Sequence, residues 1–417
     1  MMEKLQPKLR FPEFKDEWQK SYVKDHTEQL NGFAFKSENL ITEQNGYRVL
    51  RGINITEGRI RNNSEIDRYY NGDLTKLNKY KVEVNDLVIA MDGSKVGKNI
   101  SLVTKKNDGE LLVQRVSRLR EKNSNIKFIY HLINNYRFHN YVDKVNTSSG
   151  IPHISSKQID NYELLIPSLE EQTKIADFLG AVDKQLDILN QKKEKLNTYK
   201  KGVMQQLFSQ QLRFKDDNGN DFPEWEEKTL GEIGNSFNGL TGKTAKDFGE
   251  GKKYIQYKQI FDKPYIDFND CGFVNIIENE KQNECKIGDV FFTVSSETKE
   301  EIAMSSVIES SVDFPVYLNS FCFGIRFKEN VLIPKFSRFY FRNEIFRKNV
   351  IVLAQGSTRF NLSKVNFMKL AITIPSIEEQ TKIANFLSAI DNQIETVSIQ
   401  IQKTENYKKG LLQQMFV

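Results

Sequence analysis

Cysteine and histidine are scarce in this sequence, and their placement excludes several classes of protein. The 417 residues contain three cysteines, Cys271, Cys285 and Cys322, and no C-x-x-C pair. An odd, dispersed set argues against a disulfide framework or a zinc knuckle, and it favours a reducing compartment, which we expect to be the cytoplasm. The four histidines are scattered along the chain, so the sequence predicts no metal site.

Long apolar runs are missing as well. No stretch reaches the roughly 18 consecutive apolar residues expected of a membrane-spanning helix. The opening residues, MMEKLQPKLRFPEF, contain no apolar segment of the kind found in secretory signals. We therefore expect a protein that has no membrane partner.

Recognisable catalytic motifs are absent too. The stretch GLTGKT (239–244) resembles a phosphate-binding loop, but Phe237 stands where its first glycine would be. DFPEW (221–225) lacks the second proline of an amino-methyltransferase motif, and there is no G-x-S-x-G or H-E-x-x-H. These absences predict a non-catalytic chain, although scattered carboxylates leave a stand-alone nuclease or methyltransferase as an alternative.

The sequence does contain a long internal repeat. IPSLEEQTKIADFL (166–179) returns as IPSIEEQTKIANFL (374–387), with twelve of fourteen positions identical. The match continues without gaps over 166–208 and 374–416, an offset of 208 residues. Because this period has the size of a domain, it indicates a duplicated module and not a solenoid.

Each copy of the repeat has the pattern of a long helix. Ser168 and Ser376 can begin the helices, with Glu171 and Glu379 completing capping boxes. The first helix is expected over 170–207, and a heptad-like apolar seam follows in both copies. The seam residues are Leu179, Val182, Leu186, Leu189, Leu196, Leu387, Ile390, Ile394, Val397 and Ile401.

Matching seams of equal length predict that the two helices pair with each other, although each could instead pack on its own domain. Since the first helix leads from one domain into the next, the pair should be an antiparallel coiled coil, with the chain end near the first domain. The predicted class is α+β, with two mixed α/β domains at opposite ends of the pair. The predicted boundaries are 1–165 for the first domain, 166–209 for the central helix, 210–373 for the second domain and 374–417 for the C-terminal helix.

The two domains share a faint common plan. Both open with an LRF stretch that precedes FPE and a tryptophan, and both contain an apolar run led by Asp, at 85–98 and 288–301. Aromatic-rich helices are predicted at 127–144 and 334–350. Loops rich in Gly, Ser and Thr follow at 146–155 and 354–363. Diverged domains on a repeated scaffold suggest that each domain recognises a different target.

Several loops combine cations with hydrogen-bonding residues, as DNA contacts require. The net charge of +5 permits such binding without establishing it. The alternative is that these loops are the ordinary charged surface of a lysine-rich protein. The candidates are Arg51, Arg59, Arg61, Ser94, Lys95, Lys98, His153, Lys243, Lys246, Lys252, Lys253, Lys258, Arg359, Asn361 and Lys364.

Taken together, the repeated helix motif, NGFAFKSENL (31–40) and GDVFFTVSSET (288–298) make the chain resemble the specificity subunit of a Type I restriction-modification system. The resemblance covers essentially the whole length. It implies a non-catalytic subunit whose two target-recognition domains bind the halves of a gapped site in double-stranded DNA. It also implies two methyltransferase (modification) subunits and two restriction subunits as partners. S-adenosylmethionine, ATP and Mg would be bound by those partners, with no cofactor in this chain.

The resemblance also implies that the helices dock the modification subunits near their N-termini. For any single residue there, capping or packing is an equally good interpretation. A coiled-coil scaffold without DNA recognition is a further alternative for the whole chain. The implied contact residues are Glu170, Glu171, Gln172, Ile175, Phe178, Glu378, Glu379, Gln380, Ile383 and Phe386.

Overall fold

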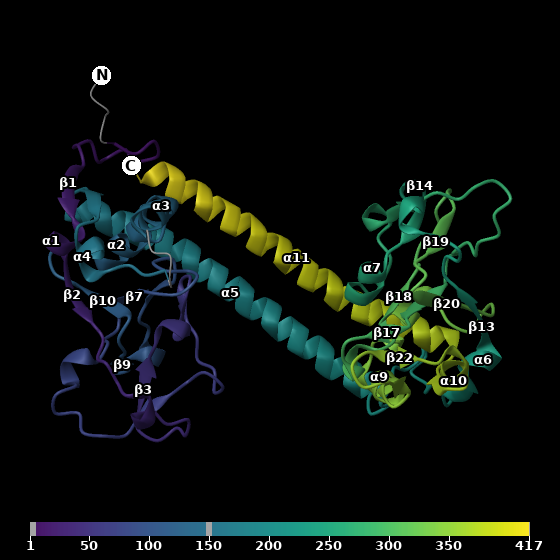
Figure 1. Cartoon of the computed structure of the whole chain (residues 1–417). Coiled ribbons are helices and arrows are strands. Elements are labelled where there is room, and N and C mark those ends of the chain that lie inside the picture. Colours follow the sequence, from purple (N-terminus) through teal and green to yellow (C-terminus); the bar gives the residue numbers. More distant parts are fainter. Residues whose placement is uncertain (1–5, 147–151, 417) are drawn as a thin grey trace. The chain divides into compact units, whose positions relative to one another are not determined.

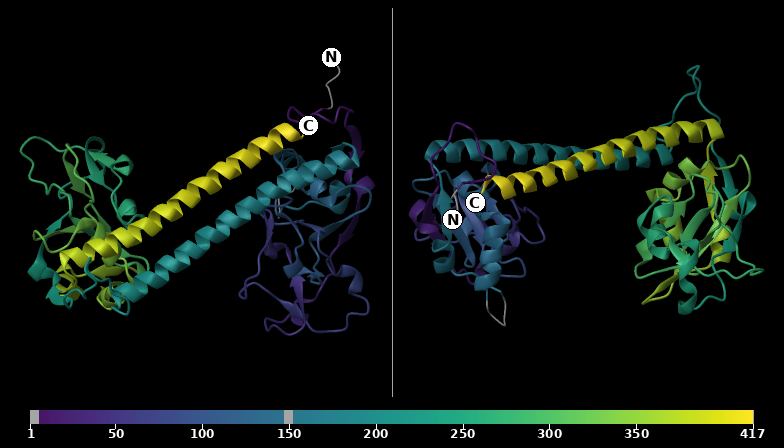
Figure 2. Two further views of the ribbon diagram at one scale, coloured as in Figure 1. Left: turned by 180° about the vertical axis from the view of Figure 1, so that it is seen from behind. Right: turned by 90° about the horizontal axis from the view of Figure 1, so that it is seen from above.

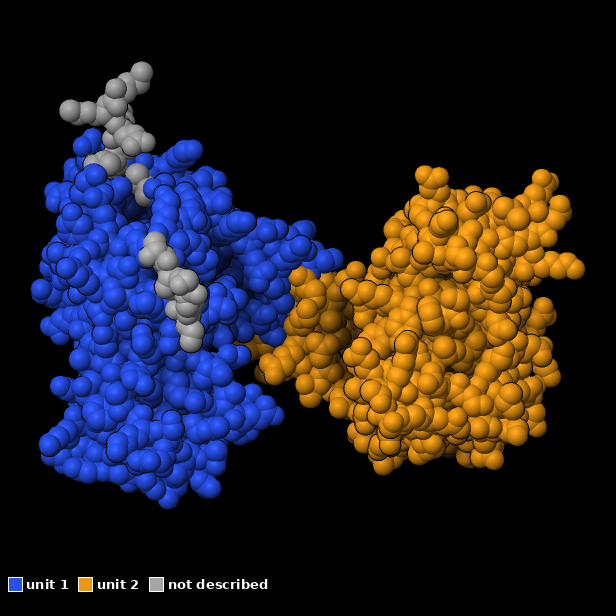
Figure 3. All heavy atoms as spheres, in the orientation of Figure 1, with its two compact units in different colours: residues 1–190, 399–417 blue, residues 191–398 orange. Residues whose placement is uncertain are grey.

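The computed structural model describes residues 6–146 and 152–416. The chain divides into two compact units (Figure 3), one made of residues 1–190 and 399–417 and the other of residues 191–398. Each unit therefore contains one α/β domain together with a stretch of both long helices. Among the described residues, no helix is both long enough and apolar enough to cross a membrane.

The repeated motif forms two long, uninterrupted helices. Helix α5 runs over Leu169–Phe208, within one residue of the predicted 170–207 at each end, and helix α11 runs over Ile377–Met415, inside the predicted segment 374–417. At 1.5 Å per residue, 40 residues extend about 60 Å. Ser168 begins α5 as expected, because its Oγ accepts a hydrogen bond from the Glu171 amide at 3.4 Å.

The two helices pack antiparallel, and they run side by side in all views (Figures 1 and 2). In one unit Lys408 pairs with Asp183 at 2.5 Å, and in the other Lys200 pairs with Asp391 at 2.6 Å. The residues in the two pairs are related by the same offset of 208. The contact is therefore reciprocal, as in an isologous interface between two copies of one surface.

The ten residues assigned to the seam are all buried or half-buried. Leu179, Val182, Leu387, Ile390, Val397 and Ile401 are buried, and the other four are half-buried. Three side chains near the C-terminal end of α5 lie in the core of the second unit, and three near the C-terminal end of α11 lie in the core of the first. These are Val203, Leu207 and Phe208 in the second unit, and Leu411, Met415 and Phe416 in the first. The expected position of the chain end beside the first domain is thus confirmed.

Each domain contains its own set of β-sheets, and the sheets of the two sets correspond in strand order and direction (Figure 1). A four-stranded antiparallel sheet has the order β2-β10-β7-β8 in the first domain and β13-β20-β16-β18 in the second. A three-stranded sheet with one parallel pair has the order β6-β3-β9 and β15-β14-β19, respectively. A two-stranded sheet, β1-β11 or β12-β23, leads into each long helix. In these sheets the strands of the first domain are β1 (Gln19–Tyr22), β2 (Thr27–Asn31), β3 (Tyr47–Leu50), β6 (Tyr69–Tyr70), β7 (Leu87–Ala90), β8 (Ile100–Leu102), β9 (Leu111–Leu112), β10 (Val116–Glu121) and β11 (Glu163–Ile166). Those of the second are β12 (Glu226–Thr229), β13 (Gly234–Asn238), β14 (Phe248–Ile255), β15 (Gly272–Val274), β16 (Val290–Thr293), β18 (Ser305–Val307), β19 (Val316–Leu318), β20 (Cys322–Phe327) and β23 (Ala371–Ile374).

The remaining strands differ between the domains. The first domain has the short hairpin β4 (Ile55–Thr56) and β5 (Arg59–Ile60). The second has a three-stranded sheet of β17 (Ser295–Ser296), β22 (Phe360–Leu362) and β21 (Ala354–Gln355). The short helices are α1 (Val23–His26), α4 (Ser156–Asp160), α6 (Leu230–Ile233), α7 (Tyr257–Asp262) and α10 (Lys364–Met368).

The predicted aromatic-rich helices are each broken in two. The segment expected over 127–144 forms α2 (Ile126–Ile133) and α3 (Tyr136–Val145), and that over 334–350 forms α8 (Pro334–Tyr340) and α9 (Glu344–Ile351). The break falls at an asparagine in both domains. Asn135 Nδ2 donates to the Leu132 carbonyl at 2.6 Å while Oδ1 accepts from the Arg137 amide at 2.8 Å. Asn343 makes the same two kinds of bond, because asparagine satisfies one helix end and begins the next.

The Asn-Gly pair after β2 explains part of the NGFAFKSENL motif. A side chain at Gly32 would place its Cβ about 2.1 Å from the carbonyl oxygen of Val113, closer than any real contact. Gly239 in the second domain has the same constraint, at 2.0 Å from the carbonyl oxygen of Asn319. Only glycine fits where the backbone approaches another strand this closely.

Candidate nucleic-acid interface

In the first domain, two of the predicted DNA-binding loops lie side by side. Asp92 and His153 form an antiparallel bridge, and the Gly93 amide donates to the Pro152 carbonyl at 3.1 Å. The Ile154 amide extends the pairing to the Met91 carbonyl at 2.9 Å. The loop predicted at 146–155 from its Gly, Ser and Thr content contains His153, and its residues 147–151 lie outside the described residues. Ser94 and His153 are both exposed on the paired segments.

Three of the predicted DNA-binding cations of this domain have an acidic partner. Lys95 pairs with Glu57 at 2.8 Å, Lys98 with Asp143 at 3.0 Å, and Arg59 with Asp187 of α5 at 3.1 Å, as the ion-pair distances show. Exposed ion pairs of this kind contribute about 0–1 kcal/mol. The cations can therefore exchange these partners for phosphate at little cost.

The two remaining arginines of the first domain support loop backbone. Arg51 is half-buried and donates through Nη2 to the carbonyl of Ile66, and burial lowers the pKa of its guanidinium. Arg61 is exposed and donates through Nη2 to the Ile53 carbonyl at 2.6 Å. Arg61 therefore presents charge to solvent, while Arg51 mainly holds the loop together.

In the second domain, the corresponding loops pair through β17 and β22. Ser295 lies opposite Asn361, and Ser296 opposite Phe360. Arg359, just before β22, donates through Nη2 to Ser295 Oγ at 3.2 Å. Arg359 and Asn361 are exposed, so both side chains are available to a ligand that approaches this edge.

The predicted lysines of the second domain fall into two groups. Lys243 pairs with Glu280 at 2.5 Å, with its side chain only 8% exposed. Lys253 donates to the Phe268 carbonyl at 2.9 Å and lies over the ring of Phe314. Both are therefore engaged inside the domain. Three other lysines, Lys246, Lys252 and Lys258, are exposed, and Lys364 is half-buried and donates to Asn238 Oδ1 at 2.6 Å.

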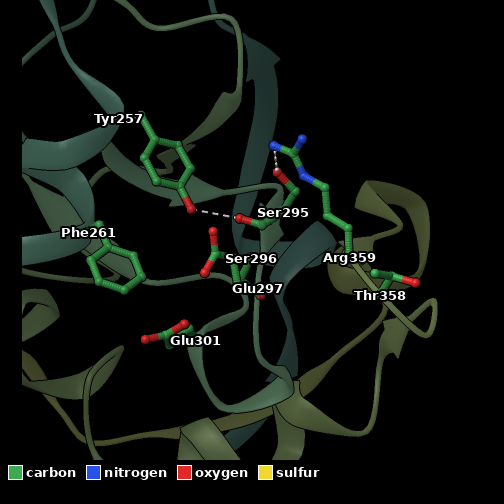
Figure 4. A pocket seen from close by; sticks show the side chains of 8 residues that line it. All are labelled: Tyr257, Phe261, Ser295, Ser296, Glu297, Glu301, Thr358 and Arg359. Carbon is green, nitrogen blue, oxygen red and sulfur yellow. Dashed lines mark hydrogen bonds between the residues drawn. The ribbon is translucent and has the colours of Figure 1, made fainter.

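A cavity of about 680 Å³ lies beside Arg359 in the second domain (Figure 4). Of its lining residues, only Arg359 belongs to the predicted DNA contacts. The others are Tyr257, Phe261, Ser295, Ser296, Glu297, Glu301 and Thr358. Tyr257 lies within a cation-rich stretch of the sequence, and Ser295, Ser296 and Glu297 lie within the motif GDVFFTVSSET, so both stretches contained a signal for this site.

The aspartate that begins each apolar run, at 85–98 and 288–301, forms a buried ion pair with an arginine of a neighbouring strand. Asp86 is 2% exposed and accepts two hydrogen bonds from Arg120 at 2.7 Å each. In the second domain Asp289 is fully buried and accepts from Arg326 at 2.8 and 2.6 Å. These carboxylates hold adjacent strands of the four-stranded sheet together and are not part of a ligand site.

The N-terminus of α5 clamps the segment that opens the first domain. Glu171 is 1% exposed, and its carboxylate accepts from Arg10 at 2.7 and 2.8 Å and from Trp18 Nε1 at 3.3 Å. This corrects the expected capping box, because the Glu171 carboxylate binds Arg10 and Trp18 and does not turn back to Ser168. Phe178 adds an edge-to-face contact with Phe11, with ring centroids 5.9 Å apart.

The second unit repeats the clamp at α11. Glu379 accepts from Arg213 at 3.2 and 2.9 Å and from Trp225 Nε1 at 3.1 Å, and Phe386 packs on Phe214. The repeated LRF and FPE-Trp stretches are thus the partners of the repeated helix motif.

The repeated glutamines bind backbone in both units. Gln172 accepts from the Asn125 amide at 3.0 Å and donates to the Pro167 carbonyl at 2.9 Å. Gln380 accepts from the Ile333 amide at 3.0 Å and donates to the Pro375 carbonyl at 2.9 Å. Six of the ten residues implied as subunit contacts are buried within their own unit, so for these six the structure favours a packing role. These six are Glu171, Gln172, Ile175, Glu379, Gln380 and Ile383. Glu170 and Glu378 are exposed, and Phe178 and Phe386 are half-buried.

Titratable groups also lie where α2 meets the helix pair. His131 is 3% exposed, with Nε2 4.0 Å from an oxygen of Asp183. Burial, with a smaller contribution from Lys408, lowers the pKa of His131 to about 3.

Among the described residues, no group of three or more His, Cys, Asp or Glu side chains lies close enough to hold a metal ion.

Comparison with known proteins gives a match that repeats along the chain. A family described as the Type I restriction modification DNA specificity domain matches residues 15–198 and again residues 223–405. The chain is 25% identical over 337 residues to the Type I restriction enzyme MjaVIII specificity subunit of Methanocaldococcus jannaschii, covering 79% of this chain and 78% of the relative. It is 22% identical over 432 residues to the EcoBI specificity subunit of Escherichia coli, covering 96% and 86%.

Solved structures have the same fold over nearly the whole chain. The S subunit of a Type I restriction-modification system from M. genitalium superposes with a TM-score of 0.58 at 16% identity, covering 99% of both chains. A chain from a study of complex assembly and conformational transition of the type I R-M system gives a TM-score of 0.56 at 15% identity, covering 96% of this chain and 97% of the other.

Proposed function

The chain belongs to the Type I restriction modification DNA specificity domain family, and on this premise we propose that its two domains bind the two halves of a gapped site in double-stranded DNA. The observation that carries the proposal is the contrast between the two domains. The two domains have equivalent sheets and the same glutamate contacts at the long helices. They differ in the loops and edge strands that expose cations and polar side chains.

The exposed cations would provide the sequence-independent part of the affinity. Arg59, Lys95 and Lys98 in the first domain, with Lys246 and Lys252 in the second, would bind phosphates and fix the register of each domain on the duplex. The paired loop segments would recognise the bases. These are the segments around the Asp92–His153 bridge in the first domain, with His153, and around the β17–β22 pair in the second, with Arg359 and Asn361.

The two long helices would set the distance between the half-sites. Both run without interruption, and the reciprocal ion pairs make their packing specific. Each helix is longer than one DNA turn of about 34–36 Å, a length that suits half-sites separated by base pairs that neither domain contacts.

Catalysis would belong to partner subunits. We assign no catalytic residue to this chain, and we propose that it recruits two adenine methyltransferase subunits and two restriction subunits. S-adenosylmethionine, ATP and Mg would then be bound by those partners. The exposed Glu170 and Glu378, with the accessible edges of Phe178 and Phe386, are the docking residues that remain on the surface of the helix N-termini.

A selection experiment tests the proposal. The purified full-length chain, alone or with its modification subunits, is incubated with a random duplex pool, and the bound DNA is sequenced. We expect two short motifs at a fixed separation, with an affinity that falls linearly on a log–log plot against salt concentration.

The alternatives give other results in the same experiment. A coiled-coil scaffold would enrich no motif and would show little salt dependence. A stand-alone methyltransferase would transfer methyl groups from S-adenosylmethionine to DNA in the absence of any other subunit, and we expect no such transfer.

A further inference from the structure

The cavity beside Arg359 has a fixed floor. Ser295 and Ser296 are 5% and 6% exposed, and β17 pairs with β22 beneath the cavity. Tyr257 donates from its hydroxyl to the Ser295 carbonyl at 2.7 Å, while Arg359 bonds to Ser295 Oγ (Figure 4). The aromatic side and the cationic side of the cavity are therefore anchored to the same residue.

The aromatic side is held in place from behind. Tyr257 and Phe261 are stacked, with ring centroids 6.2 Å apart and an interplanar angle of 18°. Both belong to α7, and Arg342 donates to the carbonyls of Ile260 and Phe261 at the end of this helix, at 2.8 and 3.0 Å. The rings are thus part of a preformed surface.

The charges on the lining select the kind of ligand. Glu297 and Glu301 line the same cavity as Arg359, and two carboxylates would repel a phosphate. Base edges have the complementary chemistry, because a guanidinium donates to guanine O6 and N7 while a carboxylate accepts from the cytosine N4 amino group. Arg359 donates one of its five N–H groups, from Nη2, to Ser295 Oγ. The remaining N–H groups of the guanidinium can donate two hydrogen bonds to a base.

We propose that this cavity recognises one G·C base pair in the half-site of the second domain, with Arg359 contacting guanine and Glu297 contacting the paired cytosine. The inference rests on the proposed function, since it assigns a specificity-determining contact within it. Ser295 is a positioning residue, because it orients Arg359 without reaching the DNA.

The first domain is built differently at the same place. Two residues after the parallel strand pair, it has Gly52 where the second domain has Tyr257. A Cβ added at Gly52 would lie 3.5 Å from Asp92 Oδ1, so the position faces the bridge in both domains. Because the first domain lacks the tyrosine, a change at Arg359 should alter one half of the recognised site only.

The test compares the full-length wild-type chain with Arg359→Ala and Glu297→Gln in the random-pool selection described above. In the Arg359→Ala variant, we expect preference at one G·C position of one half-site to fall about 5- to 150-fold, while the other half and the separation stay unchanged. Glu297→Gln should reduce the preference at the same position. Since both residues are on the surface, circular dichroism and thermal unfolding should show an intact fold.

Lys246→Ala is the matched control, because Lys246 is an exposed cation of the same domain outside the cavity. Because Lys246 would contact phosphate, the substitution should weaken binding to all sequences equally and leave the motif intact. An Arg359→Ala motif identical to that of the wild type, or an equal loss at every position, would overturn the assignment while leaving the proposed function standing. A wild-type chain that enriches no motif would overturn both.

Discussion

At the scale of single residues, a buried glutamate joins each long helix to the segment that opens its domain. Glu171 is 1% exposed and depends on Arg10 and Trp18 for its hydrogen bonds. Removing one partner of a buried ion pair leaves the other charge uncompensated, which costs about 3–5 kcal/mol. Arg10→Ala should therefore lower the free energy of unfolding of the first unit by about 3 kcal/mol, as measured by urea denaturation.

The neighbouring glutamate provides the control for this prediction. Glu170→Ala removes an exposed carboxylate from the same helix turn and should change the free energy of unfolding by less than about 0.5 kcal/mol. Equal effects of the two substitutions would show that the Arg10–Glu171 contact does not stabilise the unit.

His131 predicts a pH dependence in the first unit. Its pKa is about 3 in the folded chain and about 6.5 when unfolded, so the unfolded state binds the additional proton. The stability that depends on neutral His131 is complete above pH 6.5 and is lost as the pH falls toward 3. His131→Phe, which introduces the residue found at Phe339 in the second repeat, should remove this slope, a difference of roughly 3 kcal/mol between pH 7 and pH 4.

The reverse exchange is the control. Phe339→His should add a similar slope to the second unit, because the position is equivalent in the repeat. Unfolding free energies of wild type and His131→Phe that fall in parallel with acidification would refute the assignment.

Residue-level chemistry was only partly predictable from the sequence. Composition predicted Arg59, Lys95, Lys98 and Arg359 as DNA contacts, and the structure places all four side chains at least partly at the surface. It could not distinguish them from Lys243, because the burial of Lys243 depends on Glu280, which is far away in the sequence. For the same reason Glu171 resembled a capping residue, since its partner Arg10 is separated from it by 161 positions.

At the scale of elements, the pairing of α5 with α11 depends on matched charges as well as on apolar seams. Asp183→Lys should repel Lys408 and destabilise the first unit, and Lys408→Asp should repel Asp183. The double exchange restores the pair in reverse order. We expect a coupling energy of about 1 kcal/mol from the double-mutant cycle, measured by chemical denaturation.

An exposed pair in the same unit serves as the control. Lys20 and Glu163 are 61% and 51% exposed, so their cycle should give almost no coupling. A coupling energy near zero for Asp183 and Lys408 as well would contradict a specific ionic contact between the helices.

Elements with strong periodicity were predictable, and their interruptions were not. The seams predicted both long helices, and the bounds of α5 to within one residue, because many turns contribute to the same signal. The helices expected over 127–144 and 334–350 are broken at Asn135 and Asn343. Each asparagine bonds to both flanking helices, and local composition does not reveal this.

At the scale of the whole molecule, one chain contains two versions of a unit that carries different loops on the same sheets. An offset of 208 residues relates the helix ion pairs, the clamp glutamates Glu171 and Glu379, and the first residues of the two family matches. A common scaffold accounts for what is repeated, and the proposed recognition of two different half-sites would account for what has diverged. The two domains should therefore act as independent and exchangeable DNA-binding modules.

A domain exchange tests this central claim most directly. Residues 1–165 are replaced by the corresponding domain of a relative, the hybrid is expressed with its modification subunits, and N6-methyladenine is mapped across the genome. The account predicts that one half of the methylated motif changes, while the other half and the separation are retained. A motif that changes in both halves, or in neither, would contradict it.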